Sequence, residues 1–493
     1  MSTERFELIA PCHFGLEAVL KREILDLGYE ISKVEDGKVT FLADAQGIAD
    51  ANVFLRTTER ILLKVAEVKA ETFDELFEAT KALPWERYIP ADGKFWIAKA
   101  NSVKSKLFSP SDIQSIMKKA IVERLKGVYN VSWFPEDGAS FPIRVAFMKD
   151  VATIGIDTSG VSLHKRGYRQ MTVKAPITET LASALIMLTP WNKDRILVDP
   201  FCGSGTFPIE AAMIAADMAP GMNRSFLAED WKHLVPRKYW YDALEEAQDR
   251  VNLDIDTDIQ GYDIDPEALK SARANAKMAG VDKLIHFQQR AVKDLSHPKP
   301  YGFIITNPPY GERISTNNLL GLYQMIGERL KHAFIGNTAW VLSYREECFD
   351  QIGLKPTAKI PLFNGALECE FRKYEIFDGK YKEFKKQEGE GEGENEESGF
   401  KSREPREFKP RESRKPGEFK SRDDRPREFR PRDSKPREFG SKEDRPRGEF
   451  KPREFRKDGD RERKPFDRER RPGGSGEFKP KREFKPRKRE DGE

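Results

Sequence analysis

Between residues 176 and 382, short apolar runs alternate with segments of helical periodicity, and no other feature of the sequence constrains the fold as strongly. The runs RILVD, DIQGYDI, LIHFQQ, YGFIITN and TAWVLS have the length and composition of buried strands, and helical segments separate most of them. This alternation predicts a parallel sheet covered by helices on both faces. The last two runs, AKIPLF and ALECEFRKYEIF, flank Asn364-Gly365, a hairpin signal that predicts an antiparallel strand closing a doubly wound sheet.

The segment before this sheet mixes strand and helix patterns, which predicts an α+β domain. FELIA, GLEAVLKREILDLGY and KVTFLA read as strand, helix and strand. Ser109-Pro110-Ser111 offers a cap for the long helical segment after it, and IRVAFMKDVATIGID predicts a hairpin turning near Lys149-Asp150. The predicted domains are therefore residues 1–170 and 171–382, followed by a tail, 383–493.

The tail differs in composition from the rest of the chain. An EGEGEGENEE run leads into imperfect repeats such as REFKP and GEFKS, with isolated Phe among charges, Pro and Gly. Such a segment cannot bury enough apolar surface to offset its chain entropy, so we expect it to be disordered. Residues 401–493 hold 35 Lys and Arg against 23 Asp and Glu, a net charge of +12, whereas the first 400 residues carry −8. This basic excess favours a polyanionic partner, most often nucleic acid.

Cysteine and histidine content argues against a disulfide framework or a metal centre. The four cysteines lie far apart, and the six histidines form no ligand-like cluster with them. The N-terminus lacks an apolar signal core, and no run approaches the roughly 18 apolar residues of a membrane span. We expect a reduced, metal-free, cytoplasmic protein that does not enter a membrane.

The first predicted strand of the sheet ends in DPFCGSGT, Asp199–Thr206, where a helix begins at once. Gly203 and Gly205 allow the backbone to approach a ligand, and a helix N-terminus points N–H groups at it. The alternative is a tight strand-to-helix turn with no ligand. A dinucleotide fold is disfavoured because Thr-Phe-Pro comes after GSG where that fingerprint needs a third glycine.

The second predicted strand ends in GYDIDP, which places Asp263 at its end. A carboxylate there can accept hydrogen bonds from both hydroxyls of a ribose. Asp265 precedes Pro266, a favoured first helical residue, so we expect Asp265 to cap the next helix; capping is the alternative role for Asp263 as well.

The strand YGFII then ends in TNPPY, where two prolines stop a central strand and stiffen the backbone after it. An ordinary turn is the alternative here.

The order of these motifs resembles that of the class I S-adenosylmethionine (SAM)-dependent methyltransferases of exocyclic amines, which have a Rossmann-like sheet. The motifs are DPFCGSGT, then an acidic strand end, then NPPY. With FELIAPCHFGLEAVLKREI and DTSGVSLHKRGYR added, residues 4 to about 380 resemble bacterial THUMP-containing guanine-N2 methyltransferases of large-subunit rRNA. The first domain is then an RNA-binding domain that contains THUMP, and the tail lies outside the resemblance.

The resemblance implies a role for each motif residue in SAM binding. Asp199, Cys202, Gly203 and Gly205 would line the methionine part, and Asp263 would hold the ribose. QRA stands at 289–291 where many relatives carry an acid near the adenine, and Asp294 is the candidate replacement.

The NPPY motif, Asn307, Pro308, Pro309 and Tyr310, suits methylation of a base amine. The lone pair of such an amine is delocalised into the ring, so two acceptors on its N–H bonds would localise it toward the methyl donor. The Asn307 side-chain oxygen and the Pro308 carbonyl can be those acceptors, and Pro309 confines Pro308 to extended geometry. Tyr310 offers a flat face for a base taken out of its stack. Catalysis would need positioning and electrostatics but no metal.

The segment HKRGYR offers Lys165, Arg166, Tyr168 and Arg169 as an RNA-contacting strip, with a solvated interdomain linker as the alternative. His164 is interpreted as a spectator.

The predicted function is N2-methylation of a guanine in 23S rRNA or its assembly intermediate. Two alternatives stay open: a tRNA guanine-N2 methyltransferase of the same family, and an RNA chaperone or ribosome assembly factor with secondary methyltransferase activity.

Overall fold

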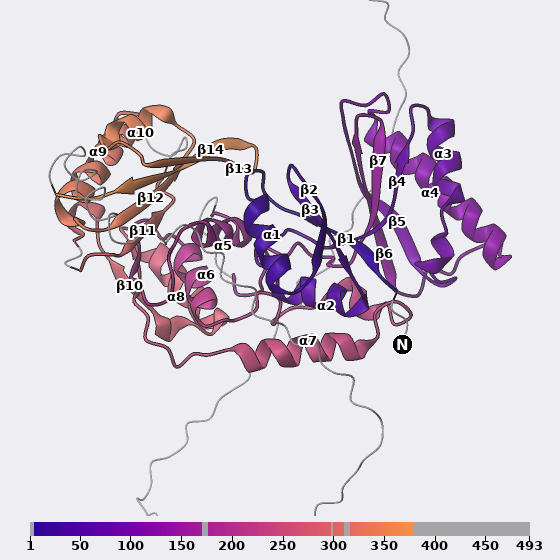
Figure 1. Cartoon of the computed structure of the whole chain (residues 1–493), viewed down its shortest axis with the longest axis horizontal. Helices are drawn as coiled ribbons and strands as arrows, with labels where there is room; N and C mark the ends of the chain where they lie inside the picture. The colour runs from indigo at the N-terminus through magenta and orange to yellow at the C-terminus, as the bar shows by residue number, and fades with distance from the viewer. Residues whose placement is uncertain (1–3, 170–175, 297–298, 310–315, 379–493) are drawn as a thin grey trace, which may run out of the picture. The chain divides into compact units, whose positions relative to one another are not determined.

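A computed structural model describes residues 4–169, 176–296, 299–309 and 316–378 of the chain, and the described part contains two seven-stranded sheets (Figure 1). The tail and Tyr310 lie outside the described residues, so the predictions made for them are not tested by the structure.

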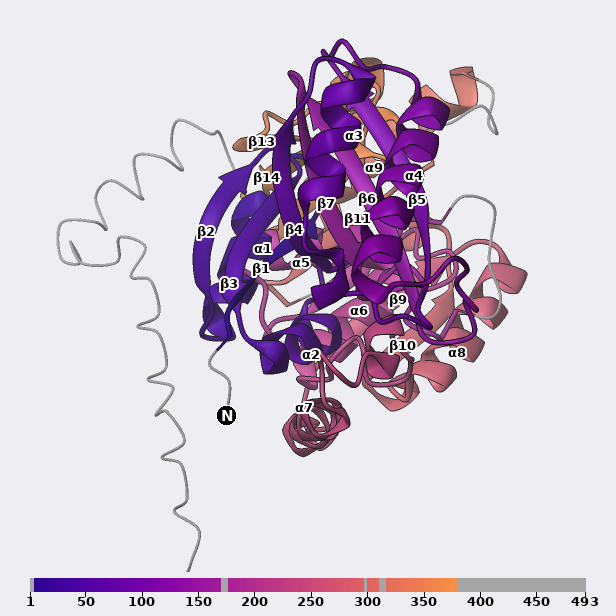
Figure 2. The same ribbon diagram turned by 90° about the vertical axis from the view of Figure 1, so that its right-hand side faces the viewer.

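The first sheet has the strand order β2-β3-β1-β4-β7-β6-β5 and is antiparallel except for the β5–β6 pair. Pairing of β1 with β4 joins two smaller sheets into one. Helices α3 and α4 lie side by side on one face of its β4 to β7 half (Figure 2). Its strands are β1 (Phe6–Pro11), β2 (Glu30–Glu35), β3 (Lys38–Ala43), β4 (Leu62–Lys69), β5 (Lys94–Val103), β6 (Ser140–Met148) and β7 (Val151–Asp157). Its helices are α1 (Glu17–Asp26), α2 (Ala45–Phe54), α3 (Phe73–Ala82) and α4 (Pro110–Tyr129).

The second sheet has the order β10-β9-β8-β11-β12-β14-β13, with parallel strands up to β12 and an antiparallel β14. Its strands are β8 (Leu197–Asp199), β9 (Ile259–Asp263), β10 (Ile285–Gln289), β11 (Phe303–Thr306), β12 (Thr338–Ser343), β13 (Ala358–Asn364) and β14 (Leu367–Glu375). Its helices are α5 (Glu179–Leu188), α6 (Thr206–Ala215), α8 (Pro266–Ala279), α9 (Thr316–Ala333) and α10 (Glu346–Ile352). Helix α7 (Arg237–Arg250) packs against α2 and buries Trp240, Ala243 and Ala247 in the core of the first sheet.

Both faces of the second sheet are buried, because neighbouring residues of one strand enter different cores. Ile305 of β11 packs in a core with α5, α6 and α8, and Ile304 packs in another with α9 and α10. Strand β8 leads outward to β9 and β10, and the chain then returns to place β11 on the other side of β8. The carboxyl ends of β8 and β11 therefore meet at a topological switch point, where open α/β sheets bind ligands.

The predicted sheet and both hairpins are confirmed. Asn364 pairs with Leu367 across the β13–β14 turn, in which Gly365 has a φ of 64°. Met148 pairs with Val151 across Lys149 and Asp150. The cap of α4 needs a correction: Ser109 stands at the cap position, but its side chain makes no capping hydrogen bond, because its hydroxyl lies 3.2 Å from the Ser111 hydroxyl instead.

Candidate active site

The ends of β8 and β9 are joined through the glycine turn. Gly203 and Gly205 have φ values of 52° and 85°, so both adopt the left-handed geometry that favours glycine. The Gly203 N–H donates to Oδ2 of Asp263 at 2.9 Å, and the Cys202 N–H donates to the Tyr262 carbonyl at 2.9 Å. Asp263 thus lies at the mouth of the turn, half-buried, with its carboxylate directed at the backbone of the turn.

Asp265 has the capping role that the sequence predicted. Its side chain accepts a hydrogen bond from the Glu267 N–H at 2.9 Å, and Pro266 is the first residue of α8. Asp263 does not cap α8: its Oδ1 accepts the Asp265 N–H at 2.9 Å, and its Oδ2 faces the glycine turn.

The ends of β8 and β11 are joined by a side-chain hydrogen bond. The Thr306 hydroxyl donates to Oδ1 of Asp199 at 2.7 Å, and the Phe201 N–H donates to the same oxygen at 3.1 Å. Burial raises the pKa of Asp199 to about 7, against the lowering effect of these two hydrogen bonds. A carboxyl group with this pKa titrates near neutral pH.

Asn307 comes directly after Thr306 and holds an acceptor with an unmet hydrogen bond. Its Oδ1 atom is buried and has no hydrogen-bond partner among the described residues. Pro308 is buried and Pro309 is exposed. An unpaired buried acceptor costs about 1–3 kcal/mol, so a donor that reached Oδ1 would recover that free energy.

Other predicted cofactor residues have mixed surroundings. The Cys202 side chain is buried in the core beside α6, and burial raises the pKa of its thiol well above the ordinary value, so it is an unreactive packing residue. A Cβ on Gly205 would lie 3.1 Å from the Ala272 Cβ, so this glycine also allows α6 to approach α8. Asp294 is exposed at the end of a short 3-10 turn, Val292–Asp294, that lies after β10.

The predicted RNA strip needs correction at two residues. Arg166 is 3% exposed and donates to the carbonyls of Leu163 and Arg56, and Tyr168 is 4% exposed and donates to Glu210 at 2.9 Å. Both side chains are used inside the protein and do not present themselves to phosphates. The physical reason is that these two side chains point inward, Arg166 to the Arg56 carbonyl and Tyr168 to Glu210 of α6, although Lys165 and Gly167 of the same segment are exposed.

The other two residues of the strip differ from each other. Lys165 is exposed. Arg169 is part-buried and bonds to the residues on both sides of Gly205, Ser204 and Thr206.

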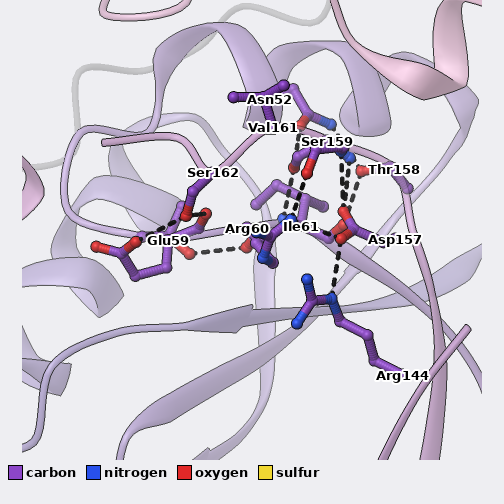
Figure 3. Close-up of polar contacts among 12 residues, drawn as sticks. Asn52, Glu59, Arg60, Ile61, Arg144, Asp157, Thr158, Ser159, Val161 and Ser162 are labelled. Carbon is purple, nitrogen blue, oxygen red and sulfur yellow. Dashed lines mark hydrogen bonds and ion pairs between the residues drawn. The ribbon is translucent and has the colours of Figure 1, made fainter. Parts of the chain in front are cut away.

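The start of the same linker is fixed at the end of β7 (Figure 3). One oxygen of Asp157 accepts from Arg60 at 2.7 Å and Arg144 at 2.9 Å, and the other accepts from the N–H groups of Ser159 and Gly160, both at 3.1 Å. The sequence motifs did not single out Asp157, although an Asp before Thr-Ser-Gly at a strand end is a signal for such a turn.

Glu59 is a second residue that the sequence motifs did not reveal. Its carboxylate contacts His164 at 2.9 Å and His13 at 3.5 Å, and it accepts from the hydroxyls of Ser162 and Thr180. Although burial opposes the shift, the contacts with His13 and His164 hold the pKa of Glu59 well below its usual range. His164 is therefore a structural partner of Glu59 and not a spectator.

Within the described residues, no group of His, Cys, Asp and Glu is arranged to hold a metal ion. No helix in the same ranges is long and apolar enough to cross a membrane.

Three family models match successive parts of the chain. Residues 7–62 match the RlmL ferredoxin-like domain, residues 70–157 match the THUMP domain, and residues 166–373 match an RMKL-like methyltransferase domain. The first two matches cover most of the first sheet, and the third match covers most of the second sheet.

Relatives with known names cover the same region. YpsC of Bacillus subtilis, which carries the name of an RNA methyltransferase, is 45% identical over 378 residues, which are 75% of this chain and 96% of YpsC. The ribosomal RNA large subunit methyltransferase K/L of Shewanella woodyi is 35% identical over 379 residues, and the matched part spans 73% of this chain but 52% of that protein. Among solved structures, SMU.472, named as a methyltransferase and complexed with SAH, is 39% identical with a TM-score of 0.72, covering 77% of this chain and 100% of its own.

Proposed function

Since the chain belongs to the THUMP-containing, RMKL-like RNA methyltransferases, we propose that it transfers a methyl group from SAM to the exocyclic N2 amine of a guanine in 23S rRNA. The observation that carries the proposal is the buried, unpartnered Oδ1 atom of Asn307 at the switch point of the described sheet. An exocyclic amine supplies the hydrogen-bond donor that this oxygen lacks. A hydrogen bond there shifts the electron density of the N–H bond toward the nitrogen and orients the nitrogen lone pair.

The residues at the switch point fit SAM. The Asp263 carboxylate accepts the Gly203 N–H on Oδ2 and the Asp265 N–H on Oδ1, and the remaining lone pairs of the two oxygens suit the two hydroxyls of a ribose. The glycine turn and the first residues of α6 provide backbone N–H groups, and Asp199 suits the ammonium of the methionine part. When bound, SAM supplies an electrophilic methyl group, and the protein supplies orientation and a water-poor site. Asp294 stays the proposed adenine contact.

Asn307 and Pro308 act together in this mechanism. The Oδ1 atom of Asn307 accepts one N–H of the amine, and the Pro308 carbonyl accepts the other. Pro309 keeps that carbonyl in place, and Tyr310 provides the stacking surface for the base. No side chain forms a covalent bond with the base, so the rate depends on how well these groups hold the amine.

The proposed RNA contacts are the first domain, Lys165 and the basic tail. The named K/L relative acts on large-subunit rRNA, which favours 23S rRNA over tRNA as the substrate. The chain spans about half the length of that relative, so the whole activity of the relative is not assigned to it. A cytoplasmic location remains a prediction.

Nucleoside analysis of rRNA and tRNA from a strain lacking this protein tests the proposal. We expect loss of one N2-methylguanosine from 23S rRNA and an unchanged tRNA profile. Loss from tRNA with intact rRNA would establish the tRNA alternative. Unchanged nucleosides in both RNAs, combined with a defect in subunit assembly, would favour the assembly-factor alternative.

A further inference from the structure

Arg169, at the end of the linker between the domains, bonds to the turn that carries the proposed cofactor residues. Its guanidinium donates to the Ser204 hydroxyl at 3.0 Å and to the Thr206 hydroxyl at 2.8 Å. These two residues flank Gly205, whose φ of 85° sets the direction in which α6 leaves the turn. Arg169 therefore braces the turn on both sides of its left-handed glycine.

The remaining donors of Arg169 reach the segment that begins α5. The guanidinium donates to Oε1 of Glu179 at 2.6 Å and to the Ile177 carbonyl at 3.3 Å. The side chains of Arg169 and Glu179 are 14% and 4% exposed, so solvent screens this ion pair weakly. Glu179 fixes the plane of the guanidinium, and the fixed plane aims the other nitrogens at the turn.

The turn is also held from its far side. Asn275 of α8 is fully buried and donates from Nδ2 to the Ser204 carbonyl at 3.1 Å. Ser204 is thus bonded by its hydroxyl to Arg169 and by its carbonyl to α8. A guanidinium suits this arrangement because its donors form a rigid planar fork, which an ammonium group does not provide.

We propose that Arg169 is a positioning residue for SAM binding, which holds the Asp199–Thr206 turn in its binding geometry through Ser204 and Thr206. The proposal rests on the cofactor role proposed above for that turn. It replaces the RNA-contacting role that the sequence suggested for Arg169, because the donors of this side chain are directed at protein acceptors.

The linker extends this brace to the first domain. Its beginning is fixed to β7 through Asp157, and its middle is fixed through Arg166, which donates to the Arg56 carbonyl (Figure 3 shows the Asp157 end). Its last described residue is Arg169. The end of β7 and the Asp199–Thr206 turn are therefore connected by a segment that hydrogen bonds hold at its start, middle and end.

Calorimetry with SAM on the full-length protein tests the proposal with Arg169→Ala, Arg169→Lys and Thr206→Val. We expect Arg169→Ala to weaken SAM binding about tenfold or more, since one or more charge-assisted hydrogen bonds to the turn are lost. Arg169→Lys restores part of the affinity, and Thr206→Val weakens it less than Arg169→Ala. In steady-state assays the KM for SAM rises by a larger factor than kcat falls, and the affinity for an rRNA fragment is unchanged.

The double variant Arg169→Ala/Thr206→Val supplies the sharpest comparison, because both single changes remove the same contact. The proposal predicts a double variant about as weak for SAM as Arg169→Ala alone. Arg250→Ala, on α7, is the matched control for loss of a part-exposed arginine and leaves SAM affinity unchanged.

Two results would overturn the proposal. Unchanged SAM affinity in folded Arg169→Lys and Thr206→Val would show that the brace has no effect on the cofactor, and these two variants decide the matter if Arg169→Ala does not fold. Weakened RNA binding with intact SAM affinity would return Arg169 to an RNA contact. Neither result concerns SAM binding or RNA methylation by the wild-type protein. The proposed function is therefore tested independently of the role proposed for Arg169.

Discussion

At Asn307 the fold leaves a buried oxygen without a hydrogen-bond partner among the described residues, and an unpaired buried acceptor generally costs stability. Unpaired buried groups persist where the surrounding structure enforces them, and such sites are often functional. Here the enforcement comes from β11 and from the two prolines after the residue. The amine of the substrate base would be the missing donor.

Asp199 provides a pH-dependent prediction. Because burial raises its pKa to about 7, the group is largely protonated below that pH in the free protein and ionised above it. The SAM ammonium favours the ionised form, so affinity should rise as pH increases through about 7 and level off above it. Calorimetry at about pH 6 and about pH 8 measures the effect. Asp199→Asn should bind SAM more weakly than the wild type at the higher pH, and its SAM affinity should no longer change with pH. An equal pH dependence of SAM affinity in the two proteins would show that Asp199 is not part of the cofactor site.

Asp263 and Asp265 form a matched pair for a second prediction. Asp263→Ala should weaken SAM binding about tenfold or more, because the ribose hydroxyls lose a charged acceptor, while RNA affinity is retained. Asp265→Ala should cost about 1 kcal/mol of stability through loss of the α8 cap, without changing SAM affinity. Calorimetry and thermal unfolding separate the two effects. If both variants bound SAM equally well, Asp263 would have no cofactor role.

At the scale of elements, the close contact of α6 with α8 depends on Gly205. A Cβ there would meet the Ala272 Cβ at 3.1 Å and the Phe287 Cζ at 3.2 Å, at a φ of 85°. We expect Gly205→Ala to cost about 1–3 kcal/mol of unfolding free energy from backbone strain, with an added cost from crowding. Gly280→Ala is the control, because its φ of 75° is similar but no atom lies within 4 Å of the added carbon. Equal losses in thermal unfolding would show that crowding at Gly205 is unimportant.

The elements also show how far sequence patterns can predict the structure. Apolar periodicity, and the Gly, Pro and Asp residues that end the apolar runs, were enough to predict the second sheet and its hairpin. They also predicted that Asp199, Asp263 and Asn307 lie at strand ends. The burial of Arg166 and Tyr168 was not, because local composition makes HKRGYR look solvated and only tertiary contacts with Arg56 and Glu210 reveal its position. The Glu59 cluster was missed for the same reason, since its partners lie about 50 to 120 residues away in sequence.

At the scale of the whole molecule, the charge distribution predicts how the tail acts. Residues 401–493 carry +12 and the rest of the chain −8, so the tail should add phosphate contacts that salt weakens. Removing those residues should lower the affinity for an rRNA fragment at low salt and flatten the salt dependence, while the methylated nucleotide stays the same. A salt titration of both proteins, with mapping of the methylated base, measures this. Identical salt slopes would show that the tail is not an RNA anchor, and a shifted methylation site would show that it selects the target.

The proposed mechanism depends on one oxygen atom, so Asn307→Ala is its most direct test. Labelled SAM is incubated with unmodified 23S rRNA and either wild-type or variant protein, with the exposed Asn252→Ala as control, and the labelled nucleoside is identified by mass analysis. We expect N2-methylguanosine with the wild type and control, a rate lower by about 10²-fold or more with Asn307→Ala, and unchanged SAM affinity. Thermal stability of Asn307→Ala should stay equal or rise, because an unpaired buried acceptor is removed. Near wild-type turnover by Asn307→Ala would contradict the mechanism, and a labelled adenine in place of guanine would contradict the proposed substrate.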